Sequence, residues 1–149
     1  MDKEKTYKLL LKQASSLLQG EHDLIAKMSN ISALLFNGLP EVSYAGFYRF
    51  QEQELILGPF QGPVACMHIQ LGKGVCGTAA QTGQIQIVPD VHEFSGHIAC
   101  DANTNSEIVV PIIHNKKLVA VLDLDSNDFD RFDQIDAQYL SKIAELLFN

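Results

Sequence analysis

Residues 106–126 read SEIVVPIIHNKKLVAVLDLDS, two apolar runs separated by a short polar segment. The runs at 108–113 and 118–124 are rich in β-branched residues, which favour strands. Asn115-Lys116 lies between them and has the length of a tight hairpin turn. The sequence therefore predicts an antiparallel strand pair here, and it is the clearest pair in the chain.

Asp123 and Asp125 lie two residues apart in the second run, so a strand places both carboxyl groups on the same face. Two neighbouring acids repel, and one of them keeps its proton to a higher pH unless it is solvated or paired. Such a group can act as a general acid near neutral pH. A solvated strand end is the other interpretation, and the residues alone do not choose between the two.

Glu107 opens the first run. A two-residue turn pairs Ile113 with Leu118, and counting back along the hairpin pairs Glu107 with Leu124. That register places Glu107 on the opposite face from the two aspartates. A β-bulge, or a position just outside the ladder, is needed to bring the three carboxyl groups together.

The rest of the chain changes periodicity twice, from helix to strand and back to helix. Asp133 and Asp136 fall in the first turn of the last helix, where the helix dipole favours acids. This layout predicts an α+β domain with helices gathered on one face of a mostly antiparallel sheet. The expected helices are 6–18, about 23–36, 75–81 and about 133–148, and the further strands are 42–50, 54–57, 64–71 and 84–88, with a break at 58–63.

The bulk properties limit the class of protein. The 149 residues suit a single domain spanning 1–149. A formal net charge of −7 argues against nucleic acid and anionic membranes as partners. Neither a signal peptide nor a run of about 20 apolar residues is evident, so a cytoplasmic location is expected. In that compartment the three cysteines are expected to be thiols with chemistry rather than a disulfide framework.

Cys100 lies in a polar loop, where scaffolds often display reactive side chains. It is interpreted as a thiolate nucleophile, and the alternative is a small buried apolar residue. The loop setting favours the nucleophile. The adjacent Asp101 raises the pKa of a neighbouring thiol, so His97 or a helix end would have to compensate.

Cys66 and Cys76 flank a glycine-rich turn at 72–74. An oxidised Cys100 would need a second thiol to resolve it, and either residue could serve. Cys76 lies within a helical stretch, where core packing is the better interpretation. The alternative interpretation is a metal site formed by Cys66, His68, Cys76, His97 and Cys100. The sequence contains no C-x-x-C pair, so the signal for such a site is weak.

Tyr44 and Tyr48 share one face of the strand at 42–50, so both could line one wall of a pocket. Packing in the core or at a sheet edge is the alternative, and it is the favoured one. His68, His92 and His114 show no partner in the sequence and are expected at the surface.

Together these segments resemble the free methionine-(R)-sulfoxide reductases, single-domain enzymes of the GAF fold. The similarity extends from the second helix to the end of the chain, with every motif in order. The matching segments are Gly58-Pro-Phe-Gln-Gly62, Val64-Ala-Cys66, Gly72-Lys-Gly-Val-Cys-Gly-Thr-Ala79, Asp90-Val91, Gly96-His-Ile-Ala-Cys-Asp101, Ser106-Glu-Ile-Val-Val-Pro111 and Val121-Leu-Asp-Leu-Asp-Ser126.

The resemblance implies a GAF domain with a six-stranded antiparallel sheet, helices packed on one face and a pocket enclosed by the cysteine loops. It implies that Cys100 is the nucleophile, that Cys66 resolves it and that Cys76 is accessory. It also implies that Glu107, Asp123 and Asp125 contact the sulfoxide and the amino-acid head group, which requires a local irregularity beside Glu107. Many family members carry Trp at the position of Tyr44.

The implied chemistry uses one thiolate as the nucleophile and one acid as the proton donor. The thiolate attacks the sulfoxide sulfur, and a neighbouring acid protonates the oxygen. Methionine and a sulfenic acid on Cys100 result, Cys66 closes a disulfide, and an external dithiol such as thioredoxin reopens it. No metal or organic cofactor is expected, and a homodimer is expected by analogy. The alternatives are a GAF sensor that binds a small ligand and a thiol redox sensor without turnover.

Overall fold

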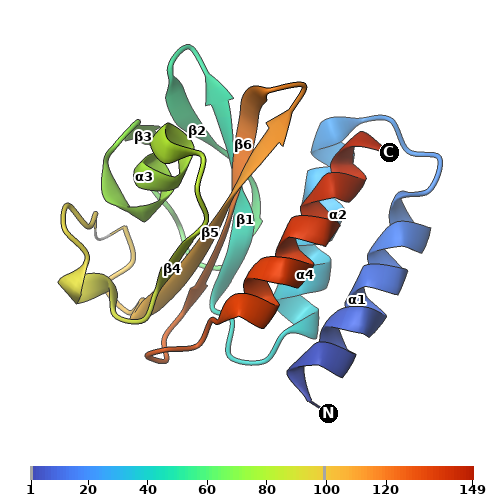
Figure 1. The fold of residues 1–149 in the computed structure, drawn as a ribbon, viewed down its shortest axis with the longest axis horizontal. Helices are drawn as coiled ribbons and strands as arrows, with labels where there is room; N and C mark the ends of the chain where they lie inside the picture. The colour runs from blue at the N-terminus through green and yellow to red at the C-terminus, as the bar shows by residue number, and fades with distance from the viewer. Residues whose placement is uncertain (1, 99) are drawn as a thin grey trace.

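A single antiparallel sheet runs through the molecule, with six strands in the order β3-β2-β1-β6-β5-β4 (Figure 1). The computed structural model describes residues 2–98 and 100–149, so Ala99 of the 96–101 motif lies outside the described residues. The predicted six-stranded antiparallel sheet is confirmed. The strands are β1 Tyr44–Gln51, β2 Glu54–Gln61, β3 His68–Gln70, β4 Gln86–Val88, β5 Ser106–His114 and β6 Lys117–Ser126.

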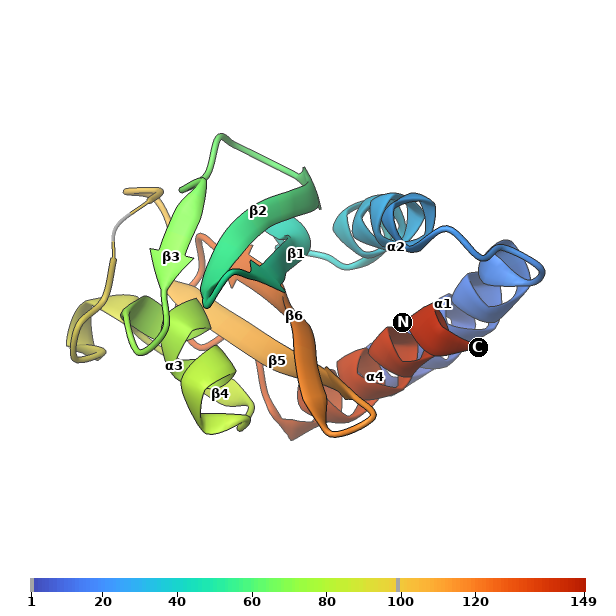
Figure 2. The ribbon, with the colours of Figure 1, turned by 90° about the horizontal axis from the view of Figure 1, so that it is seen from above.

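Helices cover the two faces of this sheet unequally (Figure 2). The long helices α1 (Lys3–Leu18), α2 (Leu24–Gly38) and α4 (Gln134–Glu145) lie on one side of the sheet, as predicted, around a large apolar core; α2 and α4 contact the strands, and α1 packs on these two helices. The short helix α3 (Gly74–Thr82) lies on the other face over a smaller core. No helix among the described residues combines the length and the apolar character needed to cross a membrane.

The helix ends follow their capping residues. Asp2 accepts a hydrogen bond from the backbone N–H of Lys5, so α1 begins at Lys3, slightly earlier than predicted. Asp133 and Asp136 form a capping box at the start of α4. The helical pattern predicted as far as residue 148 ends as α-helix at Glu145 and continues as a 3₁₀ turn at Leu146–Phe148.

The β5–β6 hairpin contains the irregularity that Glu107 requires. Asn115 and Lys116 form the turn with φ of 52° and 65°, as a tight hairpin needs. Ile113 pairs with Leu118, but Ile112 pairs with Ala120, so one extra residue is inserted into β6. Glu107 therefore lies opposite Asp125 instead of Leu124, on the same face as the aspartates.

The predicted break at 58–63 is wrong, because β2 continues to Gln61. Its register with β1 shifts between Gly46 and Tyr48, and the extra residue falls at the Gly58-Pro59 segment. Proline is tolerated at such a bulge because a regular ladder bond is not required there. Gly46 is needed on the partner strand, since a Cβ at that position would lie 2.2 Å from Cβ of Phe60. The strand predicted at 64–71 is reduced to His68–Gln70.

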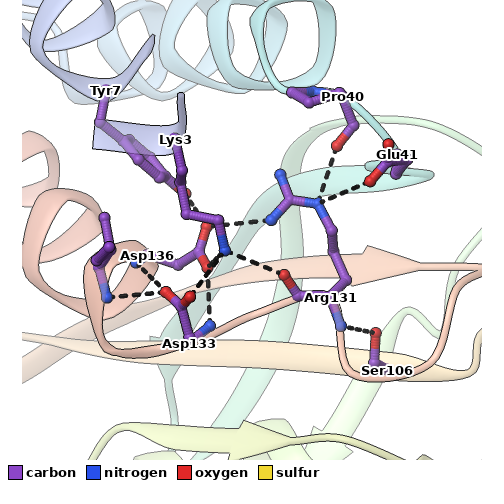
Figure 3. A network of polar contacts seen from close by, with 9 residues as sticks. Lys3, Tyr7, Pro40, Glu41, Ser106, Arg131, Asp133 and Asp136 are labelled. Carbon is purple, nitrogen blue, oxygen red and sulfur yellow. Dashed lines mark hydrogen bonds and ion pairs between the residues drawn. The ribbon is translucent and has the colours of Figure 1, made fainter. Parts of the chain in front are cut away.

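A buried polar network joins the start of the chain to its end (Figure 3). The Asp136 carboxylate accepts hydrogen bonds from Lys3 Nζ at 2.7 Å, Tyr7 OH at 2.6 Å and Arg131 Nη1 at 3.3 Å. Ser106 Oγ accepts a hydrogen bond from the backbone N–H of Arg131. The network thus holds the segment between β6 and α4 against the first residue of β5, next to Glu107.

Candidate active site

A cavity of about 50 Å³ lies between the sheet and α3. Its floor comes from β1, β5 and β6, one wall comes from α3, and the segments before β3 and after β4 close it. Cys100, Cys76, all three predicted carboxyl groups and both predicted tyrosines line this one cavity. The hairpin bulge, the loop and the first strand therefore bring together residues that are far apart in the sequence.

Glu107, Asp123 and Asp125 form a compact acid cluster on the sheet. Glu107 and Asp125 are direct cross-strand partners, and Asp123 is two residues further along the same face. Only 8% of Glu107 and 4% of Asp123 are exposed. The carboxyl groups share the face that α3 covers, which resolves the open choice on the aspartates against a solvated strand end.

Burial determines how this cluster holds its protons. Desolvation, followed by the neighbouring aspartate charges, raises the pKa of Glu107 well above its ordinary value. Desolvation and Asp123 raise the pKa of Asp125 in the same way. Burial also raises the pKa of Asp123, but hydrogen bonds from Glu107, Asp125 and Cys76 partly offset that rise. The pKa of all three carboxyl groups is raised, so the cluster as a whole retains protons at a pH where isolated carboxyl groups are ionised.

Three buried oxygen atoms in the cavity lack an ordinary hydrogen-bond partner. They are Oδ1 of Asp123, Oδ1 of Asp125 and the Tyr44 hydroxyl. Buried polar atoms without partners are costly, so fully ionised carboxyl groups would be unstable here. Protons shared between the carboxyl groups, or a ligand that donates hydrogen bonds, would satisfy them.

Cys76 is buried in α3, as its core interpretation predicted, yet it also touches the acid cluster. Its Sγ lies 3.9 Å from Oε2 of Glu107. Burial and the nearby carboxyl groups raise the pKa of the Cys76 thiol, so the neutral thiol is favoured. Cys76, Glu107 and Asp123 offer ligand atoms within 4.8 Å of one another. They could hold a divalent ion only after losing protons that burial favours.

Cys66 and Cys100 are joined by a disulfide with a Cα–Cα distance of 5.5 Å, the pairing that the family resemblance implied. The Tyr48 hydroxyl donates a hydrogen bond to the Cys66 carbonyl at 2.9 Å and so fixes one loop to β1. The Gly74 N–H donates to Gly96 O at 3.1 Å and fixes the other loop to α3. Both cysteines are half-buried, and Cys100 lines the cavity.

The residues next to Cys100 differ from the sequence expectation. The Asp101 carboxylate accepts hydrogen bonds from the Asn103 N–H and the Thr104 hydroxyl within its own loop. His97 lines the cavity, and burial, followed by the charge of His92, lowers its pKa. The neutral imidazole is therefore favoured. His97 is a poor source of the positive charge that was expected to offset Asp101.

The residues of the alternative metal set do not assemble into one site. Cys66 and Cys100 bond to each other. His68 lies on the outer strand β3, where its ring pairs with Glu54 at 2.9 Å. All three histidines expected at the surface are exposed, but each has a partner that the sequence did not indicate. His92 pairs with Asp90 at 2.8 Å, and His114 stacks on Phe148 at 4.1 Å.

Both interpretations of Tyr44 and Tyr48 hold at once, since the tyrosines line the cavity and are also well buried. Tyr44 stacks on Phe60 with ring centroids 5.4 Å apart. Phe60 is a supporting residue that the sequence analysis missed, because Gly58 and Pro59 suggested that the strand stopped. The only sequence signal was Phe60 itself, because an aromatic residue directly after Gly58-Pro59 is consistent with a strand that continues.

Comparison with known proteins agrees with this geometry. Residues 28–147 match the family model of the GAF domain. The chain is 45% identical to the free methionine-R-sulfoxide reductase of Escherichia coli, with 99% of this chain and 89% of that protein covered. It is 47% identical to the Saccharomyces cerevisiae protein of the same name, with 99% and 86% covered.

A solved structure gives the same result. The free methionine-R-sulfoxide reductase of Neisseria meningitidis, in complex with its substrate, superposes with a TM-score of 0.96 at 40% identity. The superposition covers 99% of this chain and 89% of that one. The chain therefore belongs to the GAF domain family and, within it, to the free methionine-R-sulfoxide reductases.

Proposed function

We propose that this chain reduces free L-methionine-(R)-sulfoxide to L-methionine. One observation carries the proposal: Cys100 and buried carboxyl groups that retain protons line a single cavity. A sulfoxide needs a nucleophile at sulfur and an acid at oxygen, and the cavity supplies both.

In the first half-reaction the Cys100 thiolate attacks the sulfoxide sulfur. Glu107 or Asp125 donates a proton to the sulfoxide oxygen, which is otherwise a poor leaving group. The oxygen is transferred to Cys100 as a sulfenic acid, and methionine leaves. The thiol is thereby oxidised by two electrons, and the sulfoxide is reduced by two.

In the second half-reaction the Cys66 thiol attacks the sulfenic acid, a disulfide forms and water leaves. The Cys66–Cys100 disulfide corresponds to the product of this step. An external dithiol, for which we propose thioredoxin, then reduces it by exchange. Reducing dithiols of this kind are maintained in the cytoplasm, the location that we propose. Cys76, whose thiol is kept neutral, has an accessory role.

Substrate recognition follows from the same charges. Asp123 accepts hydrogen bonds from its neighbours in the cluster, and the ammonium group of a free amino acid would pair with its carboxyl group. The Tyr44 hydroxyl and Oδ1 of Asp125 lack hydrogen-bond partners, which the ammonium and carboxylate groups of the substrate can supply. No metal or organic cofactor takes part in this scheme, and a homodimer stays an expectation by analogy.

The disulfide also limits when substrate can bind. A cavity of about 50 Å³ is far below the roughly 300–1,000 Å³ of ordinary ligand sites. We therefore expect substrate to enter only after the disulfide opens and the Cys100 loop moves.

The test is a turnover assay with dithiothreitol and each epimer of free methionine sulfoxide. We expect methionine to form from the (R) epimer, and the (S) epimer to react poorly because its oxygen points away from the acids. Cys100→Ser should abolish turnover without unfolding the protein. No methionine from the pre-reduced wild type would overturn the proposal. That result would favour a thiol redox sensor without turnover, because the Cys66–Cys100 disulfide is also consistent with such a sensor.

A further inference from the structure

The two loops that carry the disulfide expose large apolar side chains. Val64 is 86% exposed, Met67 is 69% exposed and Ile98 is 39% exposed. Val64 and Met67 flank Cys66 in the sequence, and Ile98 precedes Cys100 by two residues. The three residues, here called the apolar rim, therefore gather around one reactive bond.

The apolar rim is not explained by packing of the fold. None of its residues belongs to either apolar core or to the side chains packed against them; Val64 and Ile98 line the cavity, and Met67 lies outside it. Other exposed apolar residues lie apart from the disulfide loops: Leu17, at 48%, is in α1 and Ile25, at 47%, is in α2. Isolated exposed apolar residues are ordinary, whereas a group around a functional atom marks an interaction surface.

The disulfide presents its two sulfurs differently. Cys100 lines the cavity, whereas Cys66 lies in the outer loop between the exposed Val64 and Met67 and is not part of the lining. Both cysteines are half-buried, and Cys66 also packs against the smaller core, so a thiolate that attacks Cys66 does so from outside the cavity. Attack there forms a bond to Cys66, breaks the Cys66–Cys100 bond and releases the Cys100 thiolate into the cavity.

We propose that the apolar rim is the docking surface of a protein dithiol reductant, which attacks Cys66 and releases Cys100. The partner is a small protein with apolar surface around its own reactive cysteine. Its first thiol forms a mixed disulfide with Cys66, and its second thiol breaks that bond. The partner leaves oxidised by two electrons, and this chain regains two thiols. The inference rests on the proposed function, because it concerns recycling of the same disulfide.

Burial of the rim supplies the affinity that such an encounter needs. Apolar side chains at the centre of a small interface carry most of its binding energy. A small dithiol such as dithiothreitol needs no docking and reaches the sulfur by diffusion. The two reductants therefore report separately on docking and on chemistry.

The test is Met67→Gln, assayed at saturating methionine-(R)-sulfoxide with two reductants. Met67 is exposed and does not line the cavity, so the fold and the site are preserved. With thioredoxin, thioredoxin reductase and NADPH, we expect kcat/KM for thioredoxin to fall about tenfold, as when one central contact is lost. With dithiothreitol, we expect the rate to stay unchanged. Leu17→Gln is the matched control and should change neither value.

The outcomes are separable. An unchanged thioredoxin kcat/KM in Met67→Gln overturns the docking surface, and so does an equal fall with both reductants. Failure of the wild type to turn over with dithiothreitol counts instead against the proposed function.

A trapping experiment tests which sulfur is attacked. The disulfide form is first mixed with a thioredoxin that retains only its first cysteine, and N-ethylmaleimide is then added to cap the thiol that has been released. Peptide mapping should find maleimide on Cys100 and the thioredoxin peptide on Cys66. Maleimide on Cys66, or on neither cysteine, contradicts the proposed direction of exchange.

Discussion

Carboxyl groups are buried at two places in this molecule, and the two places differ in how many cations and hydrogen-bond donors surround them. Asp136 is fully buried, and its oxygens receive hydrogen bonds from Lys3, Tyr7 and Arg131, as well as from a backbone N–H (Figure 3). In the acid cluster, Oδ1 of Asp123 and Oδ1 of Asp125 have no partner. Among the described residues, no lysine or arginine forms an ion pair with any of its three carboxyl groups.

The difference separates a structural carboxylate from a functional one. A buried carboxylate with cations and hydrogen-bond donors around it holds segments of the chain together. Buried acids without a cation lose part of their charge, retain protons and await a ligand that completes them. The acid cluster thus reduces the stability of the fold, and we propose that it serves in return as the proton donor and the ammonium site.

The largest expected effect is on stability, at the structural carboxylate. Asp136→Asn leaves Arg131 buried beside a neutral group and removes the closer of the two carboxylates that pair with Lys3. Removal of one member of a buried ion pair costs about 3–5 kcal/mol, which urea unfolding can measure. Asp133→Asn is the matched control, because Asp133 is more exposed and asparagine also caps helices well. A similar small loss in both variants would remove the contrast between the two sites.

The second effect is on rate, at the acid cluster. Glu107→Gln and Asp125→Asn keep the shape but remove a titratable proton, so kcat should fall by roughly 10²-fold each. Asp136→Asn should leave kcat unchanged below its unfolding temperature. The check is steady-state reduction of methionine-(R)-sulfoxide with dithiothreitol. If both cluster variants retain near wild-type kcat, these carboxyl groups do not supply the proton.

The smallest effect is a gain of stability in the same cluster. The pKa of Glu107 is raised in the folded state, so below its unfolded pKa the group is protonated in both states and costs nothing. As the pH rises, the unfolded state ionises first, and the folded state of the wild type loses relative stability. The glutamine of Glu107→Gln carries no ionisable proton, so this position no longer makes the stability depend on pH.

The free energy of unfolding of Glu107→Gln should therefore exceed that of the wild type at pH 8, by on the order of 1 kcal/mol per unit of pKa elevation. The advantage should shrink toward zero near pH 4. Urea unfolding of both proteins across this range is the measurement. A variant that is less stable than the wild type at pH 8 would mean that Glu107 is paired as Asp136 is.

The sequence predicted the elements better than it predicted their register. The hairpin at 106–126 follows from its apolar runs and from the Asn115-Lys116 turn. Regular counting across that turn nevertheless placed Glu107 on the wrong face. The extra residue in β6 that corrects it has no strong local signal, because a bulge depends on how the whole strand packs.

For the candidate site, relations between residues near in the sequence could be predicted, and relations between distant residues could not. Asp123 and Asp125 could be placed together from alternation alone, because they belong to one strand. The pairing of Cys66 with Cys100 came only from the family resemblance, since no local pattern relates residues that are 34 positions apart. The contact of Lys3 with Asp136 was not predicted for the same reason, because it joins opposite ends of the chain.

The contrast between the two carboxyl sites is tested most directly by the charge of the substrate. The measurement is kcat/KM for free L-methionine-(R)-sulfoxide against its N-acetyl amide derivative, which lacks the ammonium group. A buried acid cluster left without its cation should discriminate by roughly 10³-fold or more in favour of the free amino acid. Asp123→Asn should narrow that ratio. Comparable values for the two substrates would contradict the account, because they would mean that the cluster does not need a cation to complete it.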